Sequence, residues 1–322
     1  MTSNPQTARP MKVAVVAALS PENRARVEQA APDAELIFAE RLDQVDGALA
    51  EYDAIAGHVP AEALGKASRL RWVHTWAAGP DADLYPEMMD SPVVLTSSVG
   101  NGAIPLAEHS ILLMSMLNRD APRWLRAQAE HRWDRFTHGE LNGLTLGIFG
   151  LGNSGADLAI KAQAFHMRVL GMRRHADRSV QGVDQLYRPD QLHQFLAECD
   201  FVVVTAPATA ETRGIFDTAA FRAMKPSAYW ICISRGGIAN DEALLRALRE
   251  RWIAGAGLDA QGQEPLPPDS PFWTLDNVII TPHNGATTSA TAQRGVEYFI
   301  ENLGRFVRGE PLVNVVDKMA GY

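Results

Sequence analysis

A chain of 322 residues is long enough for two domains, each with its own core. Its composition, 46% hydrophobic and 21% charged, is typical of a soluble enzyme, and a net charge of −8 argues against nucleic-acid binding. No apolar run approaches the length of a membrane span, so we expect no membrane partner. The two cysteines form no C-x-x-C pair, which indicates neither a zinc site nor a disulfide framework. We therefore expect no bound metal and a reducing, cytoplasmic location.

The first hundred residues alternate short apolar runs with helical patterns. The runs predict strands at 13–19, 35–38, 54–57, 70–74 and 93–96, and the patterns predict helices at 21–31, near Ala48 and at 61–66. This alternation predicts a small parallel α/β domain. A long helix at 105–117 is apolar nearly all round and is expected to be buried, and the helical pattern continues through 119–133.

The stretch 144–155 organises the rest of the chain. An apolar run at 144–149 has the length of a buried parallel strand, and a helical pattern follows it. Between them stand three glycines in G-x-G-x-x-G spacing, Gly150, Gly152 and Gly155. Strand, glycine turn and helix in this order predict a dinucleotide site, with the N–H groups of Asn153 and Ser154 facing the phosphates. A tight turn without a ligand is the alternative.

The β-α alternation then resumes. Strands are expected at 168–171, 201–205, 228–234, 253–258 and 277–281, and helices at 192–198, 218–224, 241–251 and about 288–307. With the run at 144–149 this makes six strands, the size of a full dinucleotide-binding sheet. The tail at 312–316 is expected to pair back onto the first domain.

Three reactive side chains stand at or just after predicted strand ends: Arg235, Glu264 and His283. Ligands of open parallel sheets bind outside the carboxyl ends of the strands, so the three are expected to converge beside the cofactor. An arginine fork binds a carboxylate, a histidine gives or takes a proton, and a carboxylate beside the histidine favours the imidazolium. Singly, each is more often a solvated or structural group, but their joint placement indicates a site. With nicotinamide they predict hydride transfer to a 2-keto acid, with His283 protonating the oxygen.

Several motifs surround these residues. They are S-R-G-G at 234–237, G-L-D at 257–259 with E-P-L-P at 264–267, T-P-H-N-G at 281–285, E-T-R-G at 211–214, M-K-P at 224–226 and G-E-P-L-V-N at 309–314. In this order they resemble the D-isomer-specific 2-hydroxyacid dehydrogenases, nearest to glyoxylate/hydroxypyruvate reductases. The resemblance covers nearly the whole chain from about residue 70 and is weak before it.

The resemblance implies two Rossmann-like domains with doubly wound parallel sheets. A discontinuous substrate domain, 1–101 and 289–322, receives the cofactor domain, 102–288, as an insertion. The family's catalytic set corresponds to Arg235, Glu264 and His283. Its carboxylate-binding loop corresponds to residues 76–79, so Arg235 and the backbone N–H groups of Ala77, Ala78 and Gly79 are the expected substrate contacts. The resemblance also implies a homodimer joined through the cofactor domain.

NADP is the expected cofactor, with NAD as the alternative. The expected contacts are Gly150, Gly152, Asn153, Ser154, Gly155, Arg173, Arg174, Thr205, Ala206, Pro207, Ser234 and Asp259, the last corresponding to the family's contact with the nicotinamide amide. A site of NAD type places an acid at the end of the second strand, but 171–174 reads G-M-R-R. Two guanidinium groups there predict a preference for the 2′-phosphate of about 2–4 kcal/mol. The nearest acid is Asp177; the alternative is that the chain turns back and Asp177 binds the ribose.

Three other functions fit parts of the sequence. Phosphoglycerate dehydrogenase is disfavoured because the sequence ends at Tyr322 without room for a regulatory domain, and formate dehydrogenase because Glu264 is expected to be missing there. A non-catalytic NAD(P)-sensing protein is disfavoured because it could lose the catalytic three, all of which are present. The sequence specifies neither which 2-keto acid is the substrate nor the physiological direction of the reaction.

Overall fold

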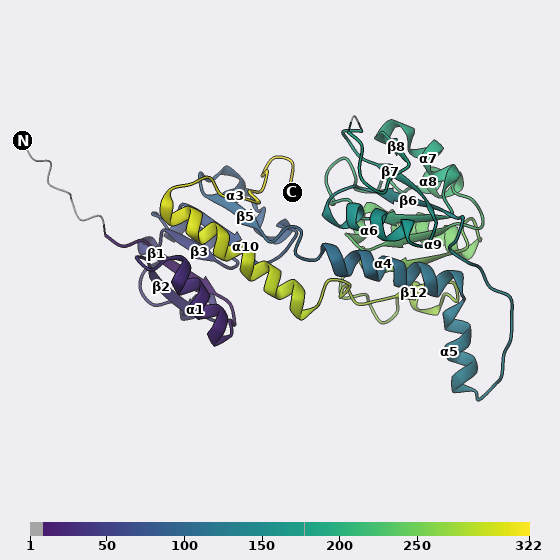
Figure 1. Cartoon of the computed structure of the whole chain (residues 1–322), viewed down its shortest axis with the longest axis horizontal. Coiled ribbons are helices and arrows are strands. Elements are labelled where there is room, and N and C mark those ends of the chain that lie inside the picture. Colours follow the sequence, from purple (N-terminus) through teal and green to yellow (C-terminus); the bar gives the residue numbers. More distant parts are fainter. Residues whose placement is uncertain (1–8, 177) are drawn as a thin grey trace, which may run out of the picture. The chain divides into compact units, whose positions relative to one another are not determined.

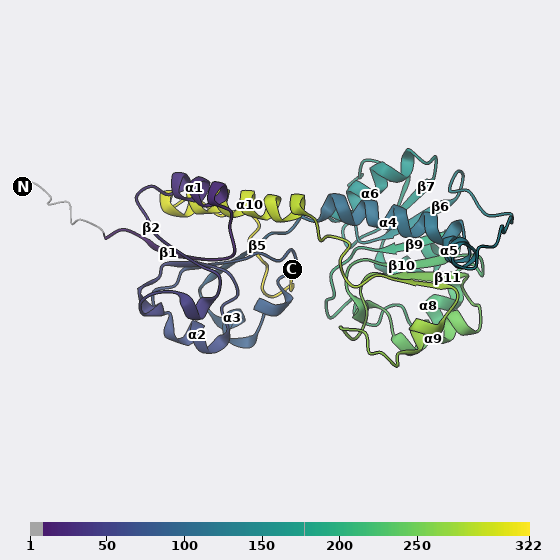
Figure 2. The same cartoon turned by 90° about the horizontal axis from the view of Figure 1, so that it is seen from below.

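The computed structural model describes residues 9–176 and 178–322. Contacts within the chain divide it into two units, Met1–Asn101 with Ser289–Tyr322 (unit 1) and Gly102–Thr288 (unit 2). Each unit is built on a parallel sheet covered by helices on both faces (Figures 1 and 2). The predicted fold class, two α/β domains with doubly wound parallel sheets, is confirmed.

Unit 1 contains a five-stranded sheet in the order β2-β1-β3-β4-β5. Its elements are β1 (Lys12–Val16), α1 (Pro21–Ala30), β2 (Glu35–Ala39), β3 (Ala54–Ala56), α2 (Ala61–Lys66), β4 (Trp72–Thr75), α3 (Pro86–Asp90), β5 (Val94–Ser97) and α10 (Ser289–Arg308). Helices α1 and α10 cover one face, and α2 and α3 cover the other (Figure 2). The tail pairs onto this sheet as predicted, through an antiparallel bridge between Val315 and Thr96.

The first strand is shorter than the predicted 13–19, because β1 ends at Val16. Ser20 already caps α1, its hydroxyl accepting a hydrogen bond from the Asn23 N–H at 3.2 Å. The intervening residues turn the chain from strand to helix, so their apolar character misled the prediction. The helix expected near Ala48 is a single 3₁₀ turn, Leu49–Glu51.

A buried polar network lies on β4 and β5 of unit 1. His74 is fully buried and its Nδ1 lies 2.9 Å from the Thr96 hydroxyl, which also accepts the indole N–H of Trp72 at 2.8 Å. The Ser98 hydroxyl lies 3.3 Å from Nε2 of the same imidazole. The rings of Trp72, Trp76 and Phe299 surround it. Burial in this aromatic cage lowers the pKa of His74 to about 3.

This shift predicts a pH-dependent stability. His74 stays neutral in the folded protein but takes a proton below about pH 6.5 when unfolded, so the unfolded state binds more protons as the pH falls. The free energy of unfolding is expected to decrease by about 2 kcal/mol between pH 7 and pH 5 through this residue alone. Glutamine in His74→Gln keeps polar groups but cannot titrate. When the free energy of unfolding is measured by urea unfolding at several pH values, it should therefore depend less steeply on pH in this variant than in the wild type. The same dependence of the free energy of unfolding on pH in variant and wild type would contradict the attribution to His74.

Unit 2 contains, in its described part, a seven-stranded sheet in the order β12-β11-β10-β9-β6-β7-β8. Its elements are α4 (Ala103–Asn118), α5 (Ala121–Ala129), β6 (Thr145–Phe149), α6 (Asn153–Gln163), β7 (Arg168–Met172), β8 (Gln185–Tyr187), α7 (Leu192–Glu198), β9 (Phe201–Val204), α8 (Thr218–Ala223), β10 (Tyr229–Cys232), α9 (Asp241–Arg249), β11 (Gly255–Leu258) and β12 (Val278–Ile280). Helices α4 and α6 cover one face, and α8 and α9 the other (Figure 2). The order reverses between β6 and β9, which is where this type of sheet binds its ligand.

The prediction of six strands in this unit was wrong by one. β8 was missed because it has three residues, lies at the sheet edge and is partly exposed, so it carries no apolar run. No helix in the described residues is both long enough and apolar enough to cross a membrane.

An arm, residues 121–140, extends from unit 2 and consists of α5 and the loop that follows it (Figure 1). The predicted continuous helix over 119–133 is interrupted at Asp120, whose φ of 49° lies in the left-handed region and ends α4. Beyond α5, Asp134 accepts hydrogen bonds from the Arg123 guanidinium at 2.7 and 2.9 Å. Arg123 and Arg132 hold the pKa of the Asp134 carboxyl well below its usual range. Ion pairs therefore shape this arm, rather than a continued helix.

Candidate active site

The glycine-rich turn between β6 and α6 has the form that a dinucleotide site requires. Gly150 has a φ of 100°, and a Cβ there would lie 2.5 Å from the Ala206 nitrogen. A Cβ on Gly155 would lie 2.3 Å from the Gly150 carbonyl oxygen, which is the close strand–helix packing expected of the third glycine. Around Gly152, in contrast, no atom lies within 4 Å of the Cβ position. This open space admits a ligand to the backbone.

Free backbone donors face this space at the start of α6. No described residue accepts the N–H groups of Asn153 or Ser154. Donors at a helix N-terminus favour an anion, so the turn fits a pyrophosphate. The residues of the turn thus fit the expected dinucleotide.

Other expected cofactor residues gather around the same turn. The Thr205 hydroxyl donates to the Gly150 carbonyl, and Ala206 packs against Gly150, so the end of β9 adjoins the glycines. The Pro207 carbonyl accepts the hydroxyl of Thr212 at 2.6 Å. Ser234 follows β10 and has a buried hydroxyl without a hydrogen-bond partner among the described residues. A bound ligand would satisfy this orphaned group.

Arg173 and Arg174 follow β7, as the sequence predicts. The Arg173 Nε donates to the His175 carbonyl. The Arg174 guanidinium forms an ion pair with Glu211 at 2.8 Å, and both side chains are exposed. An exposed pair of this kind contributes at most about 1 kcal/mol, so Arg174 can exchange Glu211 for a phosphate. Asp177, the nearest acid, lies outside the described residues.

His283 and Glu264 form a hydrogen-bonded pair. The His283 Nδ1 lies 2.7 Å from Oε2 of Glu264, whose other oxygen accepts the Gln261 N–H at 2.9 Å. His283 has a φ of 50°, in the left-handed region, as do five other described residues that are not glycine. Because the carboxylate requires a proton on Nδ1, Nε2 is the atom left for proton transfer.

Arg235 is placed by a close contact between two loops. It lies between β10 and a 3₁₀ turn, and its Nη1 donates to the Ser234 carbonyl at 2.7 Å. A Cβ on Gly236 would lie 1.9 Å from the Gln261 carbonyl carbon, so only glycine allows this contact. The loop that carries Arg235 is therefore packed against the loop that carries Glu264. Among the described residues, the structure brings all three predicted catalytic side chains to the carboxyl end of the unit 2 sheet.

Asp259 has a different role in the geometry from the one expected of it. Its carboxylate is fully buried and accepts the Thr281 hydroxyl at 2.7 Å and the N–H groups of Asn284 and Gly285 at 3.1 and 3.0 Å. These bonds fix the chain on both sides of His283. The predicted contact with the nicotinamide amide remains a prediction.

The sequence analysis missed two residues that support the catalytic loop, Gln261 and His109. Gln261 uses its side-chain amide to bond the carbonyls of Leu258 and Thr281, at 2.9 and 3.2 Å. The His109 Nε2 on α4 lies 3.0 Å from the Thr281 hydroxyl. Neither residue stands in a motif whose spacing has a chemical meaning, so no signal in a single sequence identified them.

The predicted carboxylate-binding loop follows β4 in unit 1. Ala77 and Ala78 are exposed, and no described residue accepts the N–H groups of Ala77, Ala78 or Gly79. The Ala77 carbonyl is held by the Ser98 N–H at 3.0 Å. Consecutive unpaired backbone donors form an anion-binding concavity, which is what a substrate carboxylate requires.

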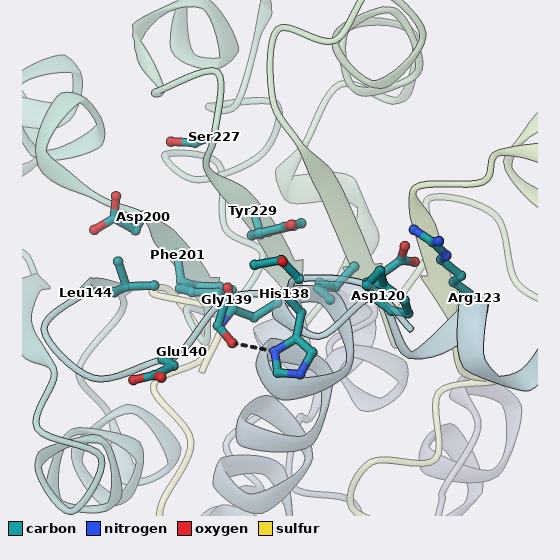
Figure 3. A pocket seen from close by; sticks show the side chains of 14 residues that line it. Asp120, Arg123, His138, Gly139, Glu140, Leu144, Asp200, Phe201, Ser227 and Tyr229 are labelled. Carbon is teal, nitrogen blue, oxygen red and sulfur yellow. Dashed lines mark hydrogen bonds between the residues drawn. The ribbon is translucent and has the colours of Figure 1, made fainter. Parts of the chain in front are cut away.

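A cavity of about 570 Å³ lies elsewhere in unit 2 (Figure 3). Leu144, Asp200 and Ser227, which precede β6, β9 and β10, line it together with residues of the arm, including Arg123 and His138. It is therefore at the amino ends of the strands, opposite the catalytic residues, and is not the catalytic site. In the part of the chain that the structure describes, no group of histidine, cysteine and acidic side chains could hold a metal ion.

Comparisons with known proteins agree with this geometry. The model of the D-isomer specific 2-hydroxyacid dehydrogenase, NAD binding domain, matches residues 111–285. The chain belongs to the D-isomer specific 2-hydroxyacid dehydrogenase family. As a member of that family it is an NAD(P)-dependent oxidoreductase, and the matched segment contains the glycine turn and all three catalytic candidates.

Individual members of the family are similar to this chain over most of its length. This dehydrogenase is 34% identical over 300 residues to a glyoxylate reductase of Korarchaeum cryptofilum, covering 89% of this chain and 87% of that one. It is 31% identical over 261 residues to a D-3-phosphoglycerate dehydrogenase of Methanocaldococcus jannaschii, covering 80% of this chain and 50% of that one. A solved structure from Sinorhizobium meliloti, an NADPH-dependent glyoxylate/hydroxypyruvate reductase in complex with NADP and sulfate, matches with a TM-score of 0.84 and 30% identity. That match covers 97% of this chain and 100% of the other.

Proposed function

We propose that this dehydrogenase uses NADPH to reduce a small 2-keto acid, of the glyoxylate/hydroxypyruvate type, to the D-2-hydroxy acid. The observation that carries the proposal is the His283–Glu264 pair at 2.7 Å, at the same sheet edge as the dinucleotide turn. The relatives named glyoxylate reductase and the NADPH-dependent structural neighbour support it.

NADPH held at the glycine turn would supply the hydride that reduces the keto carbon. His283 gives the proton on Nε2 to the keto oxygen, while Glu264 holds Nδ1 and fixes the orientation of the ring. Arg235 binds the substrate carboxylate with its planar fork. In unit 1, the free N–H groups of Ala77, Ala78 and Gly79 form a second set of donors suited to a carboxylate.

One experiment tests both the cofactor preference and the choice of substrate. A panel of 2-keto acids assayed with NADPH and with NADH is expected to give about 30-fold or more higher kcat/KM with NADPH, near 2 kcal/mol. This is the lower end of the range expected from sequence, because the phosphate must replace Glu211 at Arg174. Removing both arginines, Arg173→Ala with Arg174→Ala, should abolish the preference.

The matched control is Arg249→Ala, which removes an exposed arginine at the end of α9 and should leave the preference unchanged. Equal kcat/KM for both cofactors in the wild type would show that Arg173 and Arg174 do not bind the 2′-phosphate. Absence of activity on every 2-keto acid would overturn the proposed reaction.

We also propose a homodimer joined through the arm of unit 2. Leu125 on α5 is 59% exposed and Trp133 in the loop is 91% exposed. Large apolar side chains on a protruding segment are typical of an interface between copies. Leu125→Glu with Trp133→Glu is expected to shift the protein from dimer to monomer in sedimentation velocity. Met319→Glu, at an equally exposed apolar residue of unit 1, is the control and should remain dimeric.

A further inference from the structure

A histidine–aspartate pair outside the catalytic three lies in unit 1. The His58 Nδ1 is 2.7 Å from Oδ1 of Asp83. The Asp83 side chain is only 3% exposed, whereas that of His58 is 54% exposed. Because the carboxylate accepts the proton on Nδ1, Nε2 is the atom presented outward, and no described residue contacts it with a hydrogen bond. A buried carboxylate that orients an exposed imidazole is a built arrangement rather than a chance surface pair.

The pair adjoins the predicted carboxylate-binding loop. His58 follows β3 and the loop follows the neighbouring strand β4, so both lie at the same carboxyl edge of the unit 1 sheet. The Gly57 N–H donates to the His74 carbonyl at 2.8 Å, which ties the two strand ends together. Asp83 closes the 3₁₀ turn that follows the loop, and its N–H donates to the Pro80 carbonyl at 2.8 Å. His58 is thus anchored to the segment that carries the three free N–H groups.

The charges at this edge restrict what His58 could bind. The segments that follow β1, β3, β4 and β5, which are 17–20, 57–60, 76–83 and 98–102, contain no lysine or arginine but two aspartates, Asp81 and Asp83. Arg41, which follows the edge strand β2, forms an ion pair with Asp43. Arg294 of α10 reaches the edge, where its Nε donates to the Asn101 carbonyl at 2.6 Å. A phosphate or second carboxylate on the substrate would need more cations than this. A hydroxyl fits either form of Nε2, since it can donate to a bare nitrogen and accept from a protonated one.

We propose that His58, oriented by Asp83, is a specificity-determining residue that binds the 3-hydroxyl of a 2-keto acid whose carboxylate is held at residues 77–79. The inference rests on the proposed function and deepens it. It assigns the substrate to the 3-hydroxy-2-keto acids, such as hydroxypyruvate, and disfavours 3-phosphorylated ones.

The experiment compares three substrates with NADPH: hydroxypyruvate, pyruvate, which lacks the hydroxyl at equal chain length, and glyoxylate. His58→Ala is expected to lower kcat/KM for hydroxypyruvate about tenfold and to leave pyruvate and glyoxylate within about twofold. Asp83→Asn keeps an oxygen for Nδ1 and is expected to give a smaller loss with the same selectivity. His193→Ala, at an exposed histidine on α7, is the control and should change none of the three values.

An equal loss for all three substrates, or no loss for hydroxypyruvate, would overturn the role of His58 while leaving the proposed reaction intact. A wild-type enzyme that reduces 3-phosphohydroxypyruvate better than hydroxypyruvate would also overturn it. A wild-type enzyme inactive on every 2-keto acid would instead overturn the proposed function, and this inference with it.

Discussion

Replacing His283 with Gln is expected to lower kcat for keto-acid reduction by about a thousandfold or more. Glutamine can still bond Glu264, but its amide N–H groups are far too weakly acidic to transfer a proton, and a positioned general acid contributes about 10²–10⁴ in rate. Steady-state kinetics with NADPH and hydroxypyruvate measure the loss. NADPH affinity, followed by its fluorescence, should stay within about threefold, because His283 is not among the predicted cofactor contacts.

The partner residue gives this prediction a second readout. Glu264→Gln keeps an oxygen near Nδ1 but replaces a charge-assisted hydrogen bond with a neutral one, so the imidazole is held less firmly. The kcat for reduction should therefore fall by about tenfold, less than in His283→Gln, because the proton donor itself is still present. A kcat for Glu264→Gln equal to that of the wild type would show that the two residues do not act as a pair.

Arg235→Lys is expected to lower kcat/KM by about a hundredfold, roughly 3 kcal/mol on the transition-state scale. Lysine keeps the charge but loses the planar fork that bonds both carboxylate oxygens. The loss should be shared by all 2-keto acids, since all carry the carboxylate. The control Arg213→Lys, at a neighbouring arginine outside the predicted site, should change kcat/KM by less than about twofold. An effect of Arg235→Lys below threefold would remove Arg235 from the mechanism.

The sequence predicted the parts of the fold and site that depend on local pattern. The apolar run of β6, the three glycines and the three strand-end side chains each carry their signal within a few residues. The geometry of the His283–Glu264 pair, in contrast, depends on Asp259, Gln261 and Gly236, whose roles arise from contacts between loops far apart in the chain.

Errors in the predicted elements have two origins. β8 forms because β7 offers it an edge, although its own three residues carry no apolar run, so a tertiary contact overrides local propensity there. The break at Asp120 has a local signal that the prediction overlooked, because Pro122 stands in the first turn of α5, where proline favours the start of a new helix.

The three catalytic candidates all belong to unit 2, whereas the proposed carboxylate loop and the His58–Asp83 pair belong to unit 1. Under these proposals, the groups that transfer the proton and the residues that recognise the substrate's 3-hydroxyl belong to units with separate hydrophobic cores. Substitutions in residues 57–83 are then expected to change which 2-keto acid is preferred while hydride and proton transfer persist. Such a division would let the substrate range change through mutations in unit 1 alone.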